Sequence, residues 1–497
     1  MKLTVVKVGG ALLDGPADLD VVVEALVRRR RRGERLLVVA SALKGVTDAL
    51  ETAAQQALDP RAGNEMVGAV IQRLRHRHEW ALSRRDGTDG ARLGLRVALD
   101  DVQRLLTGIR LTGELTDRTH DLLLAQGERL SAPLLAEALR VGGCDARAVT
   151  AEEAGLVARG PFRVGRCDVD ASREGLAGLH HELHDRLLVL TGFYGVNADG
   201  DVVLFGRGGT DYTAGVVAAG LDADGLELWK DVPGFMTADP RAVPDARLVP
   251  ELSFAEACEL GYYGARILHP RCLEPLRGSD QAISLRSVLD VDRPGTKIVE
   301  RRRGARPAVA ALAHRAGVAV VRVEGAAMVN QPGVAARILE TVADADVNID
   351  AVASSMTSLS FTIADEDAGR VRRALRVLQE EDDGLLERLE IRRGIALLGV
   401  VGDGVASDPT LAARMLACLE QLGEPVELIS HGPGDVGLSC AVPEAEVVRA
   451  LQLLHDAYHG AAGDEAAAAD AEDGVAEDAD GAPGAPARVE EPGEGHA

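Results

Sequence analysis

The amino-acid sequence predicts an α/β fold over residues 1–300, followed by two smaller α+β modules over residues 307–458. In the first part, apolar strands alternate with helical stretches and end in glycine-rich turns, as in α/β folds that bind nucleotides or anions. After residue 307 the pattern changes to short units of the order βαββαβ. Residues 461–497 are mainly Ala, Gly, Pro and acidic residues, which cannot bury enough apolar surface to fold, so we expect a disordered acidic tail.

Charge and composition exclude several classes of protein. The 497-residue chain has a net charge of −23, which argues against a general nucleic-acid-binding protein. Its six cysteines lack the spacing of a metal site or a disulfide framework, so we expect buried thiols in a reducing compartment. There is no signal-peptide pattern and no apolar run long enough to span a bilayer, so we expect a soluble, cytoplasmic protein without membrane contact. The acidic, lysine-poor composition fits a high-salt cytoplasm and a GC-rich genome equally well.

Residues 204–241, LFGRGGTDYTAGVVAAGLDADGLELWKDVPGFMTADPR, are the stretch around which the first part is organised. An apolar strand runs into the turn GRGGTD, a small-residue helix spans residues 212–221, and a second strand spans residues 226–229. Glycines let backbone N–H groups approach an anion at a helix start, where the helix dipole favours negative charge. Arg207 in this turn can clamp a carboxylate or phosphate with two hydrogen bonds. Taken alone, a glycine-rich turn can equally be a steric requirement of a tight turn.

Three other segments place polar residues at turns or helix starts. The first strand ends in KVGG, and its Lys7 is a point charge suited to a transferring phosphoryl group. The next strand runs into SALKGVTD, where Ser41 and Thr47 fit either a substrate site or ordinary turn and N-cap positions. The segment AQGERLS places Glu128 at a helix start, where a carboxylate is also a routine partner of the helix dipole.

Together these motifs resemble those of aspartate kinases, members of the amino-acid kinase family. The GRGGSDYTA and WxDVxG…TxDPR elements of that family are similar to residues 206–214 and 229–241, and its KFGG, SAxxGVTxxL, GErlS and GAKVLHP motifs are similar to residues 7–10, 41–50, 127–131 and 264–270. Thr210 stands where the family usually has serine, and Ala11 and Leu12 stand where it usually has hydroxyl residues. Arg266 replaces the family's lysine, so we expect altered nucleotide affinity or phosphate geometry, because a planar fork replaces a compact ammonium.

The resemblance implies a three-layer α/β/α sandwich that phosphorylates the β-carboxylate of L-aspartate, the first step towards lysine, threonine and methionine. ATP and Mg²⁺ are the implied cofactors, with Mg²⁺ bridging phosphates and no metal site made by the protein alone. By resemblance, the catalytic residues are Lys7, Asp211 (which orients Lys7) and Arg266, and the aspartate is bound by Arg207 at its α-carboxylate, Glu128 at its ammonium, and Ser41 and Thr47. The nucleotide side comprises Lys7, Gly9, Gly10, Lys230, Asp231, Asp239, Arg241 and Arg266.

The C-terminal modules resemble ACT domains, which bind amino acids at their interfaces. The pattern predicts strands at 318–323, 347–352, 359–363, 395–401, 426–430 and 437–442, and helices at 332–344, 367–379, 408–422 and 443–455. The second module lacks a final strand, which the apolar residues 307–313 can supply, so we expect interlocked modules. The resemblance implies feedback by lysine or threonine and at least a homodimer, with an effector site at Met328, Gly333, Asn348 and Asp350.

Two other functions stay open at this point. A kinase for glutamate or acetylglutamate would share the glycine-rich turns, although the tandem modules and the GERLS motif count against it. A non-catalytic subunit that senses an amino acid would explain the departures at Ala11, Leu12 and Arg266. Because the acidic tail follows the second module, we expect no homoserine dehydrogenase domain.

Overall fold

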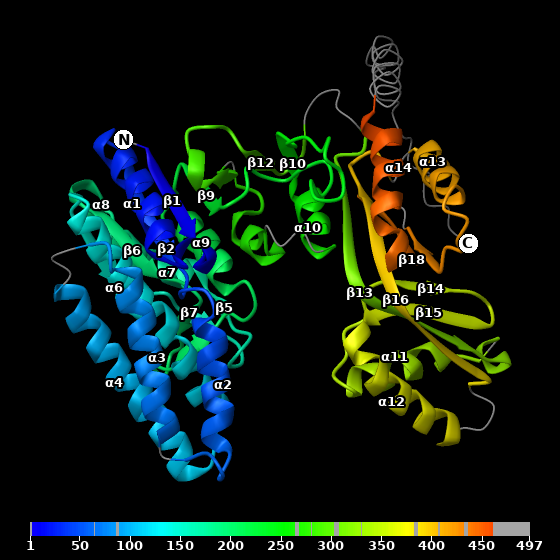
Figure 1. Ribbon diagram of the computed structural model, residues 1–497, viewed down its shortest axis with the longest axis horizontal. Helices are drawn as coiled ribbons and strands as arrows, with labels where there is room; N and C mark the ends of the chain where they lie inside the picture. The colour runs from blue at the N-terminus through cyan, green and yellow to red at the C-terminus, as the bar shows by residue number, and fades with distance from the viewer. Residues whose placement is uncertain are drawn as a thin grey trace, which may run out of the picture.

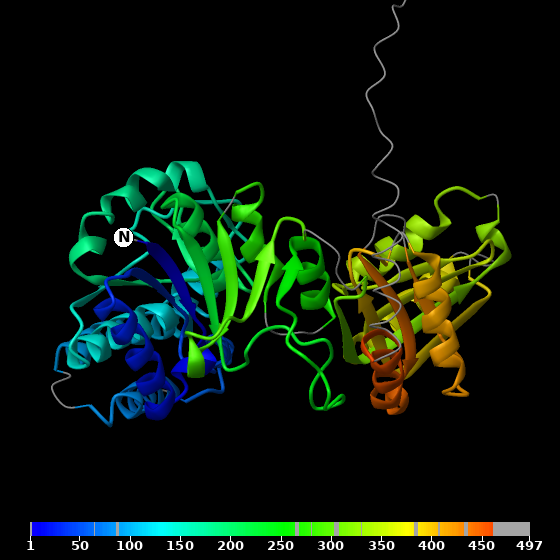
Figure 2. The ribbon, with the colours of Figure 1, turned by 90° about the horizontal axis from the view of Figure 1, so that it is seen from above.

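The computed structural model describes residues 2–63, 65–85, 89–263, 268–279, 281–302, 308–329, 331–381, 386–405, 408–431 and 436–460. An eight-stranded sheet organises the N-terminal part and a six-stranded sheet organises the C-terminal part, and the two lie next to each other (Figure 1 and Figure 2). No helix within these described ranges is long and apolar enough to cross a membrane. Most of the connector expected between residues 300 and 307, and the tail expected at 461–497, lie outside the described ranges.

The eight-stranded sheet has the order β10-β12-β11-β9-β1-β2-β6-β3. Neighbouring strands run parallel except β11 and β12, so β12 and β10 run opposite to the rest. Strands β1 and β6 are buried along their whole length, as expected for parallel strands covered on both faces. The strands are β1 (Leu3–Val8), β2 (Arg35–Ala40), β3 (Ala146–Val149), β6 (Leu187–Thr191), β9 (Gly225–Lys230), β10 (Glu251–Ser253), β11 (Ala282–Ser287) and β12 (Thr296–Val299).

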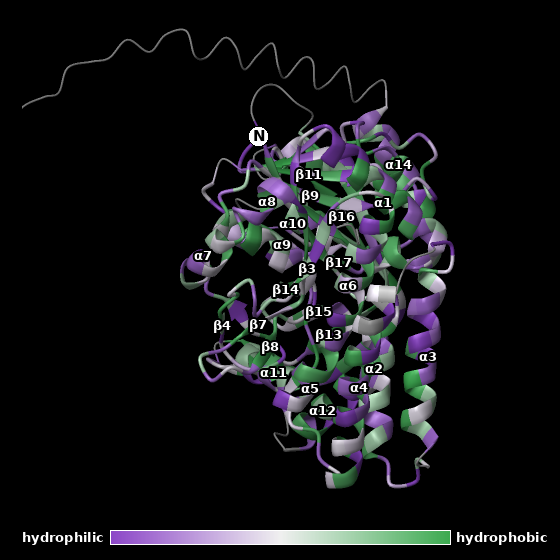
Figure 3. Cartoon of the chain, turned by 90° about the vertical axis from the view of Figure 1, so that its left-hand side faces the viewer, coloured by the Kyte–Doolittle hydropathy of each residue, from purple (hydrophilic) through white to green (hydrophobic). Residues whose placement is uncertain are grey.

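Helices on both faces of this sheet complete a three-layer α/β/α sandwich. Helices α1 and α6 pack on one face and α9 packs on the other, with every residue of α9 buried. Figure 3 shows hydrophobic and hydrophilic turns alternating along α3, as expected for a helix with one face on the core. The helices are α1 (Pro16–Arg31), α2 (Val46–Leu58), α3 (Glu65–Ala81), α4 (Asp89–Thr112), α5 (Asp117–Leu124), α6 (Gln126–Val141), α7 (Val169–Gly178), α8 (Glu182–Asp185), α9 (Gly209–Gly220) and α10 (Phe254–Tyr262).

The strand that leads into the central glycine-rich turn lies outside the main sheet, which the sequence pattern does not predict. This strand, β8 (Val202–Leu204), pairs with β7 (Tyr194–Val196) in a two-stranded antiparallel ribbon. Helix α9 begins at Gly209, three residues earlier than the apolar pattern predicts, and directly follows Gly208, whose left-handed conformation with φ 72° suits glycine. Residues 141–149 have the apolar pattern of a strand, but strand β3 begins only at Ala146, since α6 extends to Val141.

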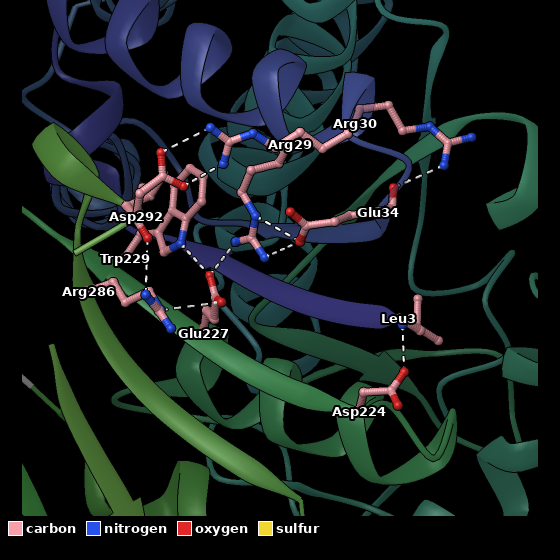
Figure 4. A network of polar contacts seen from close by, with 11 residues as sticks. Leu3, Arg29, Arg30, Glu34, Asp224, Glu227, Trp229, Arg286 and Asp292 are labelled. Atoms are coloured by element: carbon pink, nitrogen blue, oxygen red, sulfur yellow. Dashed lines mark hydrogen bonds and ion pairs between the residues drawn. The ribbon is translucent and has the colours of Figure 1, made fainter. Parts of the chain in front are cut away.

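A buried charge network fixes α1 against the middle of the sheet (Figure 4). Glu227 of β9 is 7% exposed, and it accepts hydrogen bonds from Arg29 of α1 and, at 3.0 Å, from Trp229 Nε1. Arg286 Nε of β11 lies 3.3 Å from its other oxygen, and Arg29 also pairs with Glu34. A buried carboxylate is tolerated only when it is paired, so this network holds three elements in one arrangement.

The six-stranded sheet has the order β14-β15-β13-β16-β18-β17, with helices packed against it. Two long central strands run through it, so the separate strands predicted at 307–313 and 318–323 form one element, described from Ala311 to Glu324. Its first half pairs with the end of β16, as Ala311 faces Val401, and its second half pairs with β15 and the start of β16, as Val320 faces Arg392. The elements are β13 (Ala311–Glu324), α11 (Val334–Asp344), β14 (Val352–Ser354), β15 (Ser358–Ala364), α12 (Ala368–Glu381), β16 (Arg388–Val401), α13 (Pro409–Glu420), β17 (Leu428–Ser430), β18 (Gly437–Pro443) and α14 (Val447–His459).

The strand predicted at 347–352 is wrong for most of its length. Residues 347–351 form no strand, and β14 begins at Val352. Their backbone still reaches β15, because Asp350 N donates to Thr362 O and Thr362 N donates to Ala351 O, each at 2.9 Å. An Asp346 with φ 54° precedes this segment, and the turn it makes leaves Asn348 exposed.

Helix α10 and the segment before it connect the two sheets. The N-cap hydroxyl of α10, Ser253 Oγ, lies 3.1 Å from Asp403 Oδ1 of the second C-terminal module. At the other end of α10, the Tyr263 ring packs on Gly399 of β16, where an added Cβ would lie 2.6 Å from the ring. Leu312 N donates to Thr237 O at 2.8 Å, which joins the residues before α10 to β13.

Candidate active site

The parallel strands place their carboxyl ends along one edge of the eight-stranded sheet. Strands β1, β2, β6, β9 and β11 share one direction, so the turns that follow them are neighbours. Helix α9 presents its N-terminus at the same edge, because it leads back to the start of β9. This is the edge at which open α/β sheets bind ligands.

An ion pair between β1 and α9 forms the centre of this edge. Lys7 Nζ lies 2.6 Å from Asp211 Oδ1, and the two residues are 6% and 7% exposed. Burial alone would raise the pKa of Asp211, but the charges of Lys7 and Lys230 outweigh it and lower the pKa below its usual range. Burial and repulsion from Lys7 lower the pKa of Lys230. Two ammonium groups therefore flank one buried carboxylate, which leaves excess positive charge for an anion.

The turns after β1 and β2 lie in direct contact, and glycine makes that contact possible. A Cβ at Gly10 would lie 2.4 Å from Ala42 O, and a Cβ at Gly9 would lie 3.1 Å from Lys7 Nζ. Lys44 N donates to Gly10 O at 3.2 Å. The KVGG turn therefore keeps its backbone close to the Lys7 ammonium, with no side chain between them.

Glu128 lies at the base of the same edge with one oxygen unused. It occupies the first turn of α6 and is 2% exposed, and its Oε1 accepts from Ala42 N at 3.0 Å. Its Oε2 is buried and accepts no hydrogen bond from the described residues. Burial raises the pKa of Glu128 to about 8, although the Ala42 N–H and the nearby Lys7 lower it in part. An unpartnered buried carboxylate oxygen is costly, so this atom is set to receive a cationic donor.

The predicted hydroxyl residues lie around Glu128. Ser131 Oγ donates to Ser41 O at 2.7 Å, which fixes the Ser41 backbone, and Ser41 Oγ lies 3.2 Å from Thr210 Oγ1. Thr47 is half-buried at the start of α2, and a Cβ added at Gly127 would lie 3.8 Å from its Oγ1. The structure therefore brings Ser41, Thr47 and Glu128 to one place.

His269 contributes to this site, and sequence reasoning did not single it out. A Cβ at Gly208 would lie 2.2 Å from the His269 ring, so the ring covers the turn before α9. Burial lowers the pKa of His269, Asp211 opposes the shift, and Arg271 and Arg207 lower the pKa further. Arg207 itself is exposed beside this ring. The signal for His269 is its place at the end of the ARILHP motif.

The predicted nucleotide residues are only partly brought together. Lys230 belongs to the Lys7 cluster, and the adjacent Asp231 is exposed. Asp239 and Arg241 pair with each other at 2.8 Å, while the flanking residues Ala238, Ala242 and Val243 pack in the apolar core of the second C-terminal module. Arg266 lies outside the described residues.

The predicted effector residues lie in the first C-terminal module. Gly333 is the N-cap of α11 with φ 92°, and Met328 is half-buried before it. Asp350 Oδ1 lies 2.8 Å from Arg315 Nη1 of β13, and its Oδ2 is buried without a hydrogen bond from the described residues. Burial and the Asp350 carboxylate raise the pKa of Tyr262 at the end of α10, so Asp350 also faces the N-terminal part.

A hollow of about 800 Å³ lies elsewhere, at the C-terminal end of α1. It is lined by Arg28, Arg31, Arg32, Arg84 and Arg85 together with Asp20 and Glu24. These arginines lie at or just beyond the ends of α1 and α3, where positive side chains compensate the negative ends of helix dipoles. The hollow is therefore not the candidate active site.

Comparison with known families agrees with this geometry. A family model described as the amino acid kinase family matches residues 2–287, and a model described as an ACT domain matches residues 321–380 and 398–458. These matches define a class: the chain belongs to the amino acid kinase family and carries a pair of ACT domains. The aspartokinase of Mycolicibacterium smegmatis is 35% identical over 70% of this chain and 83% of that protein. Within the amino acid kinase family, the chain therefore belongs with the aspartokinases.

Longer relatives and solved structures support the same placement. Aspartokinase 1 of Arabidopsis thaliana is 30% identical, and the bifunctional aspartokinase/homoserine dehydrogenase of Haemophilus influenzae is 29% identical, each over 72% of this chain. The chain spans 64% of the first protein and 44% of the second. The structure of E. coli aspartokinase III in complex with lysine and aspartate superposes with a TM-score of 0.78 at 26% identity, covering 92% of this chain and 99% of that one. The structure of the same enzyme with aspartate and ADP superposes with a TM-score of 0.75 at 25% identity over the same coverage, so the predicted fold class is confirmed.

Proposed function

We propose that this protein transfers the γ-phosphoryl group of ATP to the β-carboxylate of L-aspartate, giving ADP and 4-phospho-L-aspartate. The observation that carries the proposal is that Oε2 of buried Glu128, close to the Lys7–Asp211 pair, accepts no hydrogen bond from any residue that the structure describes. The Glu128 carboxylate can bind the ammonium group of an amino acid. The ammonium groups of Lys7 and Lys230 can bind a phosphate. Support also comes from E. coli aspartokinase III, which has been solved with aspartate and ADP.

The reaction requires positioning and charge compensation, and no general base. The β-carboxylate of aspartate is already anionic, so one of its oxygens forms a bond to the γ-phosphorus while the bond to the β–γ bridging oxygen breaks and ADP leaves. Lys7 stabilises the transferring group, and Asp211 holds the Lys7 ammonium in place. Lys230 adds a second positive charge near the same position.

The remaining roles follow the chemistry of each side chain. Glu128 binds the aspartate ammonium, exposed Arg207 binds the α-carboxylate, and Ser41 and Thr47 contact the rest of the substrate. ATP is the co-substrate and would bind together with Mg²⁺. Phosphate oxygens and water would supply most ligands of the ion, so few protein carboxylates are needed. We assign the nucleotide to Lys7, Gly9, Gly10, Lys230 and Asp231, with Asp239, Arg241 and Arg266 on its outer side.

We assign residues 1–300 to catalysis, 307–458 to regulation and 461–497 to the acidic tail. The effector is lysine or threonine, held by Met328, Gly333, Asn348 and Asp350, and the enzyme is at least a homodimer. The lysine-bound structure of E. coli aspartokinase III supports the choice of an amino-acid effector.

A hydroxylamine trap tests this function directly. Purified protein with ATP and Mg²⁺ is given aspartate, glutamate or acetylglutamate, and the acyl phosphate is captured as a hydroxamate. We expect product with aspartate, and a Glu128→Gln variant with a much higher aspartate KM. Product with only glutamate or acetylglutamate would assign another amino-acid substrate, and no product with any of them would favour a non-catalytic sensing subunit.

A further inference from the structure

Thr210 contacts both Ser41, which is predicted to bind the substrate, and Gly192, which follows strand β6. It is the second residue of α9 and is 7% exposed. Its Oγ1 lies 3.2 Å from Ser41 Oγ. Its methyl group packs on Gly192, where an added Cβ would lie 2.5 Å from Thr210 Cγ2 and 3.1 Å from Val39 Cγ1. The two branches of one side chain therefore face two different partners.

A β-branched side chain with one branch held has no freedom left in the other. The hydroxyl and the methyl leave Cβ in two of its three staggered directions, so seating the methyl on Gly192 fixes the direction of the hydroxyl. A serine at this position would lack the methyl and could turn its hydroxyl towards a carbonyl of the preceding turn. Thr213 shows this alternative in the same helix, because its Oγ1 donates to Gly209 O at 2.8 Å.

The segment that packs against the Thr210 methyl, Gly192 with Phe193, is itself held to α9. Phe193 N donates to Thr213 Oγ1 at 3.0 Å, and a Cβ at Gly209 would lie 2.7 Å from the Phe193 ring. The residues after β6 therefore cannot move away from the start of α9 without breaking these contacts. Ser131 Oγ donates to the Ser41 carbonyl and fixes the Ser41 backbone, so the Ser41 hydroxyl can still rotate about its side-chain bond.

We propose that Thr210 is a positioning residue for Ser41: its methyl, seated on Gly192, aims its hydroxyl so that the Ser41 hydroxyl is held ready for the aspartate substrate. The inference rests on the proposed function, in which Ser41 contacts aspartate. Thr210 then acts through Ser41 and needs no substrate contact of its own. The replacement of the family's serine by threonine supplies the methyl that this arrangement uses.

A double-mutant cycle separates this role from direct substrate binding. Thr210→Ser removes the methyl and Thr210→Val removes the hydroxyl, and each is made in the wild type and in Ser41→Ala. In the wild type we expect each to raise the KM for aspartate roughly 3- to 10-fold, the range for one weakened hydrogen bond, with the KM for ATP unchanged. In Ser41→Ala we expect either change at Thr210 to alter the aspartate KM less than about twofold, since the partner is gone.

Two results would overturn the positioning role. One is an equal rise in aspartate KM with and without Ser41, which means that Thr210 acts on the substrate by itself; the other is a matched change in ATP KM. Thr52→Ser is the matched control, because Thr52 is an exposed helix residue whose hydroxyl donates to Asp48 O at 2.8 Å. Aspartate affinity measured by calorimetry without ATP repeats the cycle independently of turnover. Failure of the proposed function would appear separately, as a wild type that forms no aspartyl hydroxamate.

Discussion

Lys7 on the first strand and Asp211 on α9 form an ion pair of 2.6 Å although 203 residues separate them in the chain. Both are buried. The charge of Lys7 helps to lower the pKa of Lys230 and opposes the rise that burial causes in the pKa of Glu128. The pair therefore links the turn that faces phosphate to the helix whose N-terminus faces the substrate. In the proposed reaction, this pair holds the Lys7 ammonium where it stabilises the transferring phosphoryl group.

Removing the Lys7 ammonium tests its role in phosphoryl transfer. We expect Lys7→Ala to lower turnover by about 10²- to 10³-fold, because a fixed cation on the transferring group is lost. Lys297→Ala is the control, since Lys297 is an exposed residue of β12. Hydroxamate formation at saturating ATP and aspartate measures the effect. Near wild-type turnover in Lys7→Ala would remove Lys7 from the chemistry.

Removing the Arg207 guanidinium tests its role in binding. We expect Arg207→Ala mainly to raise the aspartate KM, because Arg207 lies outside the Lys7–Asp211 pair and is exposed beside His269. The loss of a bidentate contact to a carboxylate corresponds to about 10- to 100-fold in affinity. Steady-state kinetics with aspartate and ATP varied separately distinguish this outcome. A fall in kcat with an unchanged aspartate KM would contradict the assignment.

Glu128 predicts a pH dependence whose sign follows from its burial. The pKa of Glu128 is about 8 in the fold and 4.5 in the usual reference state, so between these pH values the folded protein holds a proton that the unfolded chain has released. The contribution of Glu128 to the stability of the ligand-free protein therefore falls as pH rises from about 4.5 to about 8. We expect Glu128→Gln to flatten this part of the profile and to melt higher than wild type near pH 8. Melting temperatures across this range check the expectation, and parallel profiles would refute it.

Binding of aspartate should reverse the protonation of Glu128. Because the substrate ammonium favours the ionised carboxylate, aspartate binding below about pH 8 should release a proton. Calorimetry in two buffers of different ionisation enthalpy measures this proton. Glu128→Gln should bind aspartate without release, and proton release that persists in this variant would point to another group.

We expect Asp350 in the regulatory part to bind the ammonium group of the effector. Its Oδ1 pairs with Arg315 and its Oδ2 is buried without a described partner, as with Glu128 in the catalytic part. We expect Asp350→Asn to weaken inhibition by lysine or threonine by about 10- to 100-fold, because the effector ammonium loses a buried charge partner. Asp365→Asn is the control, since Asp365 pairs with Arg393 in the same module. Equal inhibition of wild type and Asp350→Asn would exclude this residue from the effector site.

The acidic tail should be dispensable for catalysis. Residues 461–497 contain eleven acidic residues and one arginine, with no apolar pattern that could pack on the rest of the chain. We expect truncation after Gly460 to leave the melting temperature and the aspartate and ATP KM values unchanged at fixed salt. A fall of several degrees in melting temperature would show that the tail contributes to the fold.

Local pattern was enough to predict much of the architecture. Strands β1 and β2 are mainly apolar in sequence, because strands covered on both faces bury nearly every side chain. The turns at or beside Lys7, Ser41 and Asp211 were also recognisable, since glycine and small polar residues interrupt the apolar runs there. Their convergence could be expected from the shared direction of parallel strands.

Several features of the fold and the site depend on contacts between segments that are distant in the sequence, so only the tertiary structure shows them. The sequence cannot show that β8 leaves the main sheet, that 311–324 is one strand shared by two modules, or that Asp239 and Arg241 pair beside the core of the second module. Nor does it show that the Thr210 methyl packs on Gly192, or that one oxygen of Glu128 has no hydrogen-bond partner within the described ranges. Short segments carry the same apolar pattern whichever partner covers them, so the sequence determined the elements and their chemistry, whereas long-range packing determined which side chains meet.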